Sequence, residues 1–512
     1  MSASDLNVEA PPLRPPLQRS AAPRDLEPDE KDLEKIQKWQ HERLQKRMRG
    51  EYESQMVHLA DTINANSSTP SQIASVRIEG TQLTRPSFLK FLIDPLIPAP
   101  SPENDLQSSI QTAAKIADTL KLAGIFRSVD AKLERARAPR AGPFDVDIVV
   151  RAQEYGKFMV KAATDISGEN AGSTSLDATI RNVFGGGETL TANASIGTAT
   201  TRAFNTVFTM PVTPSLWTRA ELQAFASATD LTSTASCTEG VRGVKALIRS
   251  GIVGRGMHEF AYNAVLRNIG HLLPAASVAI REEAGQTVKS SLTHTFVLDN
   301  RNDSLMPTKG FYLRTLNELA GLGGDAAFVK SEVNTNISRP VYPGVSLSFT
   351  ARSGFILGLA GKPTLFSDRF QLGGPSSIRS FRTSGMGPRD AHLSSPSASP
   401  STAPFSGADS LGGEVFWSAG LSVISNLPRR PEWPLKAHAW VNAGRLDNVD
   451  RSRPVGETLT TLIRRPAVSA GVGVVYTLPP ARLELNFGLP LVASGSDATR
   501  RGLQLGVGLE FL

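Results

Sequence analysis

The sequence predicts a mainly β protein, a sixteen-stranded transmembrane antiparallel β-barrel preceded by one small α/β domain. From about residue 155 onward, segments of roughly ten residues alternate apolar and polar side chains, which is the period of a strand with one dry and one wet face. No run of about 18 apolar residues occurs in the chain, so a membrane-spanning helix is not expected. A closed barrel is then the remaining structure that can satisfy every backbone amide inside a bilayer.

The alternation is clearest near the C-terminus. In residues 482–489 the odd positions are apolar, and the even positions include Arg482, Glu484 and Asn486. Residues 502–511 repeat the pattern, with Gln504 and Glu510 opposite an apolar set. Because successive side chains of a strand point to opposite faces, one face of each segment suits lipid or a core, and the other suits water.

The same pattern defines sixteen candidate strands. They cover residues 157–166, 174–183, 188–198, 202–212, 218–230, 239–251, 256–270, 289–301, 310–320, 328–341, 345–358, 414–425, 435–446, 466–478, 481–492 and 501–512. The connections after even-numbered strands are short, whereas all the long ones follow odd-numbered strands, and the longest covers 359–413. Short turns on one rim and long loops on the other are typical of outer-membrane barrels. A soluble β-sandwich also alternates, but the uniform run of strands favours the barrel.

Residues 1–72 are expected to form a flexible leader with a charged helix. Residues 1–27 are rich in Pro, Arg and Ser, and in residues 28–64 acidic residues precede basic ones, the order that a helix dipole favours. A solvated helix is the simpler interpretation, and a docking helix for a partner is the alternative. No apolar run of a secretory signal peptide is present near the start, so we expect insertion into any membrane to follow synthesis in the cytosol.

Residues 73–152 predict a compact α/β domain in the order strand, helix, helix, strand, strand. The strands are expected at 73–78, 126–133 and 144–150, and the helices at 86–91 and 105–123. The second helix should supply core contacts, and we assign them to Ile110, Ala114, Ile116, Leu120 and Leu122.

Composition limits the classes of function. Apolar residues make up 40% of the chain and charged residues 20%, which suits a folded protein with a large buried or lipid-facing surface. Lys and Arg outnumber Asp and Glu, 55 to 48, which permits attraction to anionic lipid without demanding it, and no nucleic-acid partner is expected. The single cysteine, Cys237, excludes an intramolecular disulfide and a cysteine-rich zinc site.

The most distinctive local sequence is FQLGGPSSIRSFRTSGMGPRD at residues 370–390, within the longest connection. It resembles the signature loop of the outer-membrane insertase superfamily, whose members join polypeptide-transport-associated (POTRA) domains to a sixteen-stranded barrel. Within that superfamily the chain most resembles the core barrel subunit of the mitochondrial sorting and assembly machinery. The resemblance covers roughly residues 73–512, so it implies that residues 73–152 are a POTRA-like domain.

The family loop carries a motif of an aliphatic residue, Arg, Gly and an aromatic residue, which folds into the lumen and fixes its arginine on the inner wall. The matching positions here are Ile378, Arg379, Ser380 and Phe381, with Ser380 in place of the usual glycine, a change associated with the mitochondrial branch. A guanidinium in a confined polar lumen needs a bidentate acceptor or several carbonyl groups.

Further matches suggest where the loop docks. They are the pair Gly412 and Gly413 at the end of the loop and the segment WVNAG at residues 440–444. The expected lumen-wall partners are therefore Glu414, Asn442 and Gly444. Many relatives have an acidic residue at the position of Asn442, so the partner of the motif arginine stays open, and Glu414 is one candidate.

Two shorter patterns also resemble the mitochondrial branch. RNVFGGGE at residues 181–188 is interpreted as a glycine-rich turn, not as a phosphate-binding loop, because no Lys-Ser/Thr pair follows it. In the last strand, Gln504, Gly506, Leu509 and Phe511 fit the polar, glycine, hydrophobic, hydrophobic pattern of the mitochondrial β-signal.

The resemblance implies an insertase that folds β-barrel precursors into the mitochondrial outer membrane through a lateral seam between its first and last strands. The seam residues would be Lys157, Phe158, Met159, Val160 and Lys161 in the first strand and Gln504, Gly506, Leu509 and Phe511 in the last. The POTRA-like domain would lie in the intermembrane space. Expected partners are barrel precursors, peripheral subunits of a sorting and assembly complex, and membrane lipid.

Three alternatives remain at this stage: a passive porin-like channel, a polypeptide translocation pore of the same superfamily, and an enzyme. The inward loop and the appended domain argue against a passive channel. The enzyme is least favoured, because the chain has no G-x-S-x-G, H-E-x-x-H or P-loop motif, and no catalytic, cofactor or metal residues are expected. The pair His258 and Glu259 lacks a second histidine of a zinc motif and is interpreted as two faces of one strand.

Overall fold

The computed structural model describes residues 30–48, 63, 66–99, 101, 104–137, 139, 141–167, 171–393, 407–427, 433–449, 460, 462–478 and 481–508. The chain divides into two compact units, one of residues 1–79, 96–117 and 130–151 and the other of residues 80–95, 118–129 and 152–512. The predicted leader, residues 1–27, lies outside the described residues. Of the charged helix expected over 28–64, the structure describes α1 (Glu30–Met48). None of the described helices is long and apolar enough to cross a membrane.

The small α/β part has the predicted order of elements. The order is β1 (Gln72–Glu79), α3 (Pro86–Ile93) with the short η1 (Asp94–Leu96), α4 (Leu106–Leu122), β2 (Phe126–Arg135) and β3 (Asp145–Glu154). The strands form a sheet in the order β1-β3-β2, in which β1 and β3 are parallel. A proline at the first turn starts α3, where a missing N–H costs no helical hydrogen bond.

The predicted core face of α4 was partly wrong. Ile116 and Leu120 are buried, but Ala114 and Leu122 are exposed and Ile110 is only half-buried. The buried stripe instead follows the helical period through small residues, and its members are Ser109, Thr112, Ala113, Ile116, Ala117 and Leu120. Small buried side chains carry little hydropathy signal, so the sequence pattern pointed to a neighbouring face.

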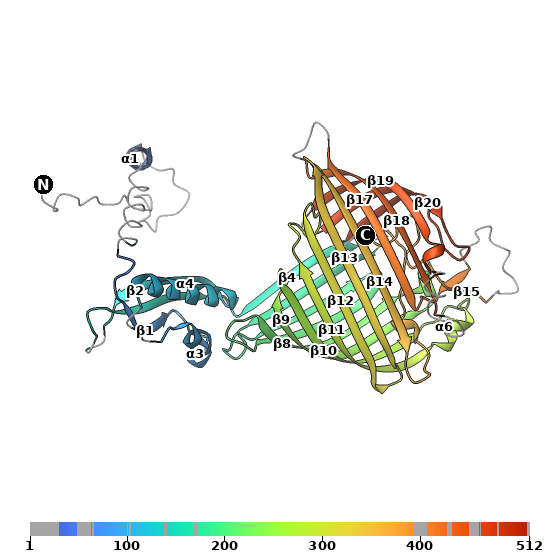
Figure 1. Ribbon diagram of the computed structural model, residues 1–512, viewed down its shortest axis with the longest axis horizontal. Coiled ribbons are helices and arrows are strands. Elements are labelled where there is room, and N and C mark those ends of the chain that lie inside the picture. Colours follow the sequence, from blue (N-terminus) through green and yellow to red (C-terminus); the bar gives the residue numbers. More distant parts are fainter. Residues whose placement is uncertain are drawn as a thin grey trace. The chain divides into compact units, whose positions relative to one another are not determined.

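Residues from 158 onward form one antiparallel sheet of sixteen strands, which curls into a barrel (Figure 1). Its strands are β4 (Phe158–Ser167), β5 (Ala171–Arg181), β6 (Thr189–Gly197), β7 (Thr200–Pro211), β8 (Thr218–Asp230), β9 (Thr238–Ile252), β10 (Gly256–Gly270), β11 (Gly285–Asp299), β12 (Gly310–Gly324), β13 (Phe328–Tyr342), β14 (Val345–Gly358), β17 (Val415–Asn426), β18 (Leu435–Asp447), β19 (Ala467–Leu478), β20 (Ala481–Val492) and β21 (Gly502–Gly508). The predicted fold class is therefore confirmed, with strand ends shifted by a few residues. Residues 509–512 of the predicted last strand lie outside the described part.

The alternation separates the two faces of the barrel wall. In β20 the even positions Arg482, Glu484 and Asn486 are buried toward the lumen, whereas Leu485 and Phe487 are about half exposed on the outside. β20 thus presents polar groups inward and apolar groups outward, which is the arrangement of a barrel strand in lipid.

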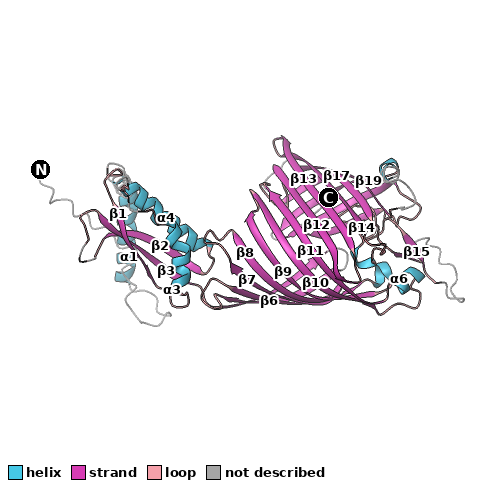
Figure 2. Cartoon of the chain, turned by 60° about the horizontal axis from the view of Figure 1, so that its bottom comes forward, coloured by secondary structure: helices cyan, strands magenta, loops and turns pink. Residues whose placement is uncertain are grey.

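The connections differ between the two rims. The long connections 271–284, 359–414 and 448–466 follow β10, β14 and β18, which are the seventh, eleventh and thirteenth strands of the barrel. Their end of the barrel is the long-loop rim, and the opposite end is the short-turn rim. The long connections contain α6 (Val278–Glu282), η2 (Phe366–Asp368), β15 (Arg389–Ala391) and β16 (Ala408–Ser410). Figure 2 shows α6 and β15 at the same end of the barrel, where the Asp390 carboxylate accepts a hydrogen bond from the Ala279 N–H at 3.1 Å.

The turn at 182–188 has the predicted glycine chemistry. Gly185 and Gly187 have positive φ angles of 86° and 77°, which favour glycine. The Asn182 side chain accepts a hydrogen bond from the Gly187 N–H at 2.9 Å, and Glu188 accepts one from the Gly186 N–H at 2.8 Å. These local bonds close the turn, so its glycines have a structural explanation.

The sheet has two edges, β4 and β21. β4 pairs with β5 from Phe158 to Ser167, and β21 pairs with β20 from Gly502 to Gly508. Within the described residues no hydrogen-bonded ladder joins β4 to β21.

Candidate functional site: a loop fixed inside the barrel

The connection 359–414 enters the lumen and is held by two buried ion pairs on strands far apart in the sheet. Near its start, the Asp368 carboxylate accepts two hydrogen bonds of 2.7 Å from the Arg267 guanidinium of β10. Further on, Arg379 donates from Nε and Nη2 to Glu484 Oε2 of β20 at 3.1 and 2.9 Å. Because both anchors are charge-assisted hydrogen bonds, the loop is fixed across the lumen, not only at one end.

Arg379 belongs to a closed ring of interactions on the inner wall. The Arg379 side chain is 1% exposed and Glu484 is 0% exposed. Asn486 donates to Glu484 Oε2 at 2.7 Å and accepts a hydrogen bond of 3.1 Å from the Trp440 indole N–H. The Arg379 guanidinium carbon lies 5.3 Å from the centre of the Trp440 ring. The arginine thus receives both a carboxylate and an aromatic face, which suit a delocalised cation.

A second arginine shares the same carboxylate. Arg482, on the same strand, forms an ion pair with Glu484 Oε1, while Arg379 contacts Oε2. One buried carboxylate therefore lies between two guanidinium groups, one from the loop and one from the wall.

Glycines on the wall make room for the loop motif. Ile378 is fully buried against Gly444 of β18, where an added Cβ would overlap the Ile378 Cδ1 atom. An added Cβ at Gly488 of β20 would overlap the Ser380 Oγ, and one at Gly471 of β19 would lie 2.6 Å from Trp440. A side chain at Gly444 or Gly488 would displace the loop motif, and one at Gly471 would displace Trp440, which contacts Arg379.

Ser380 has a left-handed backbone, with φ of 67°. This conformation favours glycine, which explains why a glycine is usual at this position of the motif. The Ser380 Oγ is buried and has no hydrogen-bond partner among the described residues. The serine side chain therefore adds strain at a position where its hydroxyl makes no contact that offsets it.

The last strand also holds the motif. Gln504 of β21 is 3% exposed; its side chain accepts a hydrogen bond from the Ser380 N–H at 2.8 Å and donates one to the Phe381 carbonyl at 3.3 Å. The Arg500 N–H donates to the Ser380 carbonyl at 2.9 Å, and Phe381 forms a bridge with Thr499. The loop is thus connected directly to an edge strand of the sheet.

The structure places the predicted wall residues as follows. Asn442 donates to the Ser377 carbonyl at 3.0 Å, and Gly444 receives Ile378, so both contact the loop. Glu414 was the wrong choice of carboxylate for Arg379: it accepts hydrogen bonds from Thr364 Oγ1 at 2.7 Å and from the Val449 N–H at 3.0 Å. The partner is Glu484, whose inward position was visible in the alternation of residues 482–486, but pairing it with Arg379 requires the three-dimensional register.

The predicted seam residues lie on the two edge strands, except that Lys157 directly precedes β4 and that Leu509 and Phe511 are outside the described residues. Phe158 and Val160 are 72% and 67% exposed on β4, Lys161 is exposed, and Lys157 and Met159 are half-buried. On β21, Gly506 pairs with Glu484, while the Gln504 side chain points inward to the motif. Gln504 therefore belongs to both the seam strand and the loop site.

The connection 300–309, on the short-turn rim, also reaches across the lumen, a feature that the sequence did not predict. Met306 is buried with Ile424 of β17 and Val475 of β19. The Leu305 carbonyl accepts a hydrogen bond of 3.0 Å from Arg482 Nη1 of β20. We call residues 300–309 the lumen strap.

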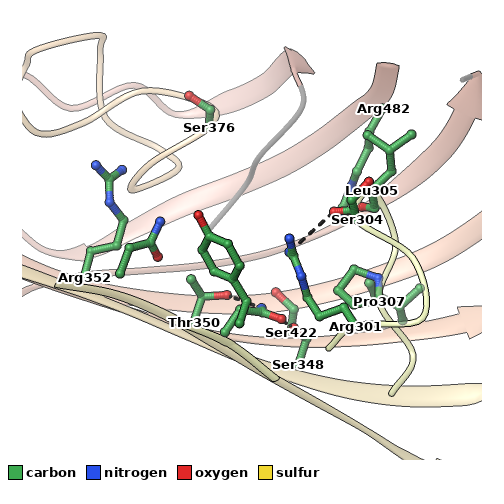
Figure 3. A pocket seen from close by; sticks show the side chains of 14 residues that line it. Arg301, Ser304, Leu305, Pro307, Ser348, Thr350, Arg352, Ser376, Ser422 and Arg482 are labelled. Carbon is green, nitrogen blue, oxygen red and sulfur yellow. Dashed lines mark hydrogen bonds between the residues drawn. The ribbon is translucent and has the colours of Figure 1, made fainter. Parts of the chain in front are cut away.

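A polar cavity of about 260 Å³ adjoins the lumen strap. Its lining includes Arg301, Arg352 and Arg482, together with Ser376 of the inward loop (Figure 3). Two of these arginines are ion-paired, Arg301 of the lumen strap with Asp299 of β11 at 2.8 Å and Arg352 of β14 with Glu332 of β13 at 3.1 Å. The lumen strap and the inward loop thus approach each other across a small polar space.

The described part of the chain contains no cluster of side chains suited to binding a metal ion. Among the described residues, no group of three or more His, Cys, Asp or Glu side chains is arranged to hold a metal ion. The arrangement of the site is one of positioning, in which buried polar contacts fix a loop against strands at one edge of the sheet.

The fold and the site together define a membrane β-barrel of sixteen strands, in which an inward loop places a buried arginine beside the last strand. A model of the Omp85 superfamily domain matches residues 182–511. The chain therefore belongs to the Omp85 superfamily, and its relatives include the sorting and assembly machinery component 50 proteins. This confirms the resemblance of the signature loop.

Individual relatives cover most of the chain. It is 33% identical over 467 residues to a SAM50-like protein of Schizosaccharomyces pombe, which is 89% of this chain and 94% of that protein. It is 31% identical over 447 residues to the sorting and assembly machinery component 50 homolog of Xenopus tropicalis, 86% of this chain and 90% of that protein. The fold is similar to that of BamA from Haemophilus ducreyi lacking POTRA domains 1–3, with a TM-score of 0.70, 16% identity and coverage of 86% and 85%.

Proposed function

We propose that the chain is the insertase core of a sorting and assembly machinery, which folds β-barrel precursors into the mitochondrial outer membrane by templating their strands at a seam between β4 and β21. Its relationship to the component 50 proteins and the fold shared with BamA support an Omp85-type insertase barrel integral to that membrane. The role is not enzymatic. The partners are barrel precursors, peripheral subunits of the complex and membrane lipid.

The observation that carries the proposal is the pair of edge strands. β4 is hydrogen-bonded along its length to β5, and β21 to β20, while no ladder joins β4 and β21 within the described residues. A precursor strand in hydrocarbon must pair its backbone groups, since each unsatisfied group is costly there. A free edge of β4 supplies donors and acceptors in register, so an incoming strand can add to it by β-augmentation.

The composition of β21 favours the same seam. Gly502, Gly506 and Gly508 lie within this short strand, and glycine in a strand weakens side-chain packing. Gln504 ties the strand to the inward loop. The loop thus stabilises β21 from the lumen side. The edge of β21 that faces β4 stays able to pair and to separate.

The filled lumen argues for sideways release over a passive channel or a threading pore. The inward loop is anchored on β10 and β20, and the lumen strap packs against β17, β19 and β20. A polypeptide moving through the lumen would have to displace both. A client that pairs at the seam displaces neither of them.

The small domain completes the proposal. We assign residues 73–152 to a POTRA-like domain in the intermembrane space that hands precursors toward the seam. Its deletion should slow precursor hand-over while the barrel still integrates into the membrane. An unchanged insertion rate would count against this role.

Locking the seam tests the proposal. Cysteines at Val160 of β4 and, in turn, at Leu503, Leu505 or Val507 of β21 should form a disulfide in at least one pair. Insertion of a radiolabelled barrel precursor into mitochondria should stop in the oxidised variant and return after reduction. Full insertion by a variant whose seam is completely crosslinked would refute the seam mechanism, and single-cysteine variants are the matched controls.

A further inference from the structure

A row of hydrogen-bonding side chains crosses the outer wall of the barrel over β10–β13. It consists of His258, His294, Asn317 and Ser331, and we call it the polar stripe. Asn317 is directly opposite His294 on β11 and Ser331 on β13 in the strand register. The stripe lies in the middle of the sixteen-strand order, on strands that adjoin one another in Figure 1, and is remote from both edges of the sheet.

The outward direction of the stripe follows from its neighbours on the same strand faces. His258 and Asn317 are exposed, whereas Glu259, the next residue after His258, points inward and pairs with Lys245 and Arg249. This separation agrees with the interpretation of His258 and Glu259 as two faces of one strand. The outer positions around the stripe are apolar and 41–60% exposed, and they include Phe260, Leu292, Leu319 and Phe355.

The stripe residues bond to one another in pairs. His258 Nδ1 and His294 Nε2 share a hydrogen bond of 3.1 Å, and Ser331 Oγ donates to Asn317 Oδ1 at 2.9 Å. No described residue accepts a hydrogen bond from the amino group, Nδ2, of the Asn317 side chain. On a wall that faces lipid, an amide with an unused donor is unfavourable, since acyl chains offer no acceptor.

The stripe crosses the wall obliquely. His258 lies toward the short-turn end of β10 and Ser331 toward the long-loop end of β13, three strand spacings away, so the stripe is about 15 Å long. Asn317 is midway along β12. A lipid headgroup reaches only the rims, so it cannot account for a polar amide at mid-height. An occupant that satisfies the whole stripe therefore has to lie within the membrane, beside the middle of the wall.

We propose that the polar stripe is the docking surface for one tilted transmembrane helix of a partner protein, whose facing side chains hydrogen-bond to Asn317 and its neighbours. Polar side chains join membrane-spanning elements in this way, and such helices tilt by up to about 40°. The proposal rests on the proposed membrane location. Because the stripe is far from β4 and β21, the helix stays bound while a client occupies the seam.

A second copy of this chain fits less well. Two copies related by a two-fold axis along the membrane normal present the same surface to each other. Their oblique stripes would then cross and meet only near the middle. A helix can follow the stripe along its length, so the geometry favours a helix from another protein.

A model peptide tests the surface directly. The probes are a poly-leucine transmembrane peptide with one central glutamine and the same peptide without it, mixed with the full chain in dioleoylphosphatidylcholine vesicles. Energy transfer should report about threefold to tenfold tighter binding of the glutamine peptide. The variant N317L/S331V should lose this preference and the conservative variant N317Q/S331T should keep it. Equal binding of both peptides to the unsubstituted chain would overturn the proposal.

Crosslinking in mitochondria tests the occupant. A photoreactive amino acid at Leu319, beside the stripe, should give an adduct that maps to a membrane-spanning helix of another protein and is lost in N317L/S331V. The same probe at Phe487 on β20 should not give it. Adducts with lipid alone, or with a second copy of this chain, would overturn the proposal. Alkali-resistant membrane association of N317L/S331V separates failure of docking from failure of the membrane assignment.

Discussion

Arg379 and Glu484 form a buried ion pair, 2.9 Å between Nη2 and Oε2, although 105 residues separate them in the chain. The same carboxylate also contacts Arg482, whose guanidinium holds the Leu305 carbonyl of the lumen strap. Glu484 is therefore the point at which the inward loop, the wall and the lumen strap meet.

Removing the two members of this pair should have unequal effects. R379A leaves Glu484 paired with Arg482, so the loop loosens while the barrel still integrates, and precursor insertion falls. E484A leaves two buried guanidinium groups without their carboxylate, a change that costs about 3–5 kcal/mol in comparable sites. The unfolding temperature can be measured by heating samples and separating folded from unfolded barrel by semi-native gel electrophoresis. This temperature should fall further for E484A than for R379A. Equal unfolding temperatures, or normal insertion by R379A, would contradict this role for the pair.

Replacing Ser380 by glycine should stabilise the loop. The left-handed backbone costs a non-glycine residue about 1–2 kcal/mol, and the Ser380 Oγ has no hydrogen-bond partner among the described residues. S380G should therefore raise the unfolding temperature, while S380V should lower it because a β-branched side chain tolerates this backbone poorly. A lower unfolding temperature for S380G would show that the serine makes a contribution absent from this geometry.

The contact between Gly444 and Ile378 should show compensating substitutions. G444A introduces a methyl group where the Ile378 Cδ1 lies, and overpacking of this kind costs about 1–3 kcal/mol. I378V removes that Cδ1 atom, but the added methyl group would still lie 2.7 Å from the Trp417 carbonyl oxygen, so G444A/I378V should recover only part of the thermal stability and insertion lost by G444A. Additive losses in the double variant would indicate that the two residues do not share this contact.

Cys237 should be unreactive in the folded barrel. It is fully buried in the connection before β9, and burial raises the pKa of its thiol to about 11. Since the thiolate is the reactive form, N-ethylmaleimide at pH 7.5 should label Cys237 only after unfolding in detergent and heat. Rapid labelling of the native protein would contradict the packing of this connection, and engineered surface cysteines provide the positive control.

The barrel was predictable from the sequence because each strand carries its own signal. Alternation in residues 482–489 sets the faces of β20 without reference to any other strand. The motif residues Ile378 to Phe381 were identified by their local sequence. The partner of Arg379 was not, since an inward carboxylate occurs on several strands and only the register brings Glu484 to the loop.

Two other features had no local signal. The lumen strap has an ordinary turn composition, and its course across the lumen depends on Met306 finding Ile424 and Val475 on distant strands. The buried face of α4 uses Ala113 and Ala117, whose small side chains do not stand out from exposed alanines such as Ala114. Tertiary packing decided both cases.

Crosslinking between β4 and a client is the most direct measurement of the mechanism. Single cysteines at Val160 or Ala162 of β4, in mitochondria importing a barrel precursor with a cysteine in its last strand, should form a disulfide that appears during insertion and decays as the precursor is released. Matched cysteines on β12, far from either edge, should form none. If every β4 position stays uncrosslinked while the precursor inserts at its normal rate, templating at this edge is contradicted.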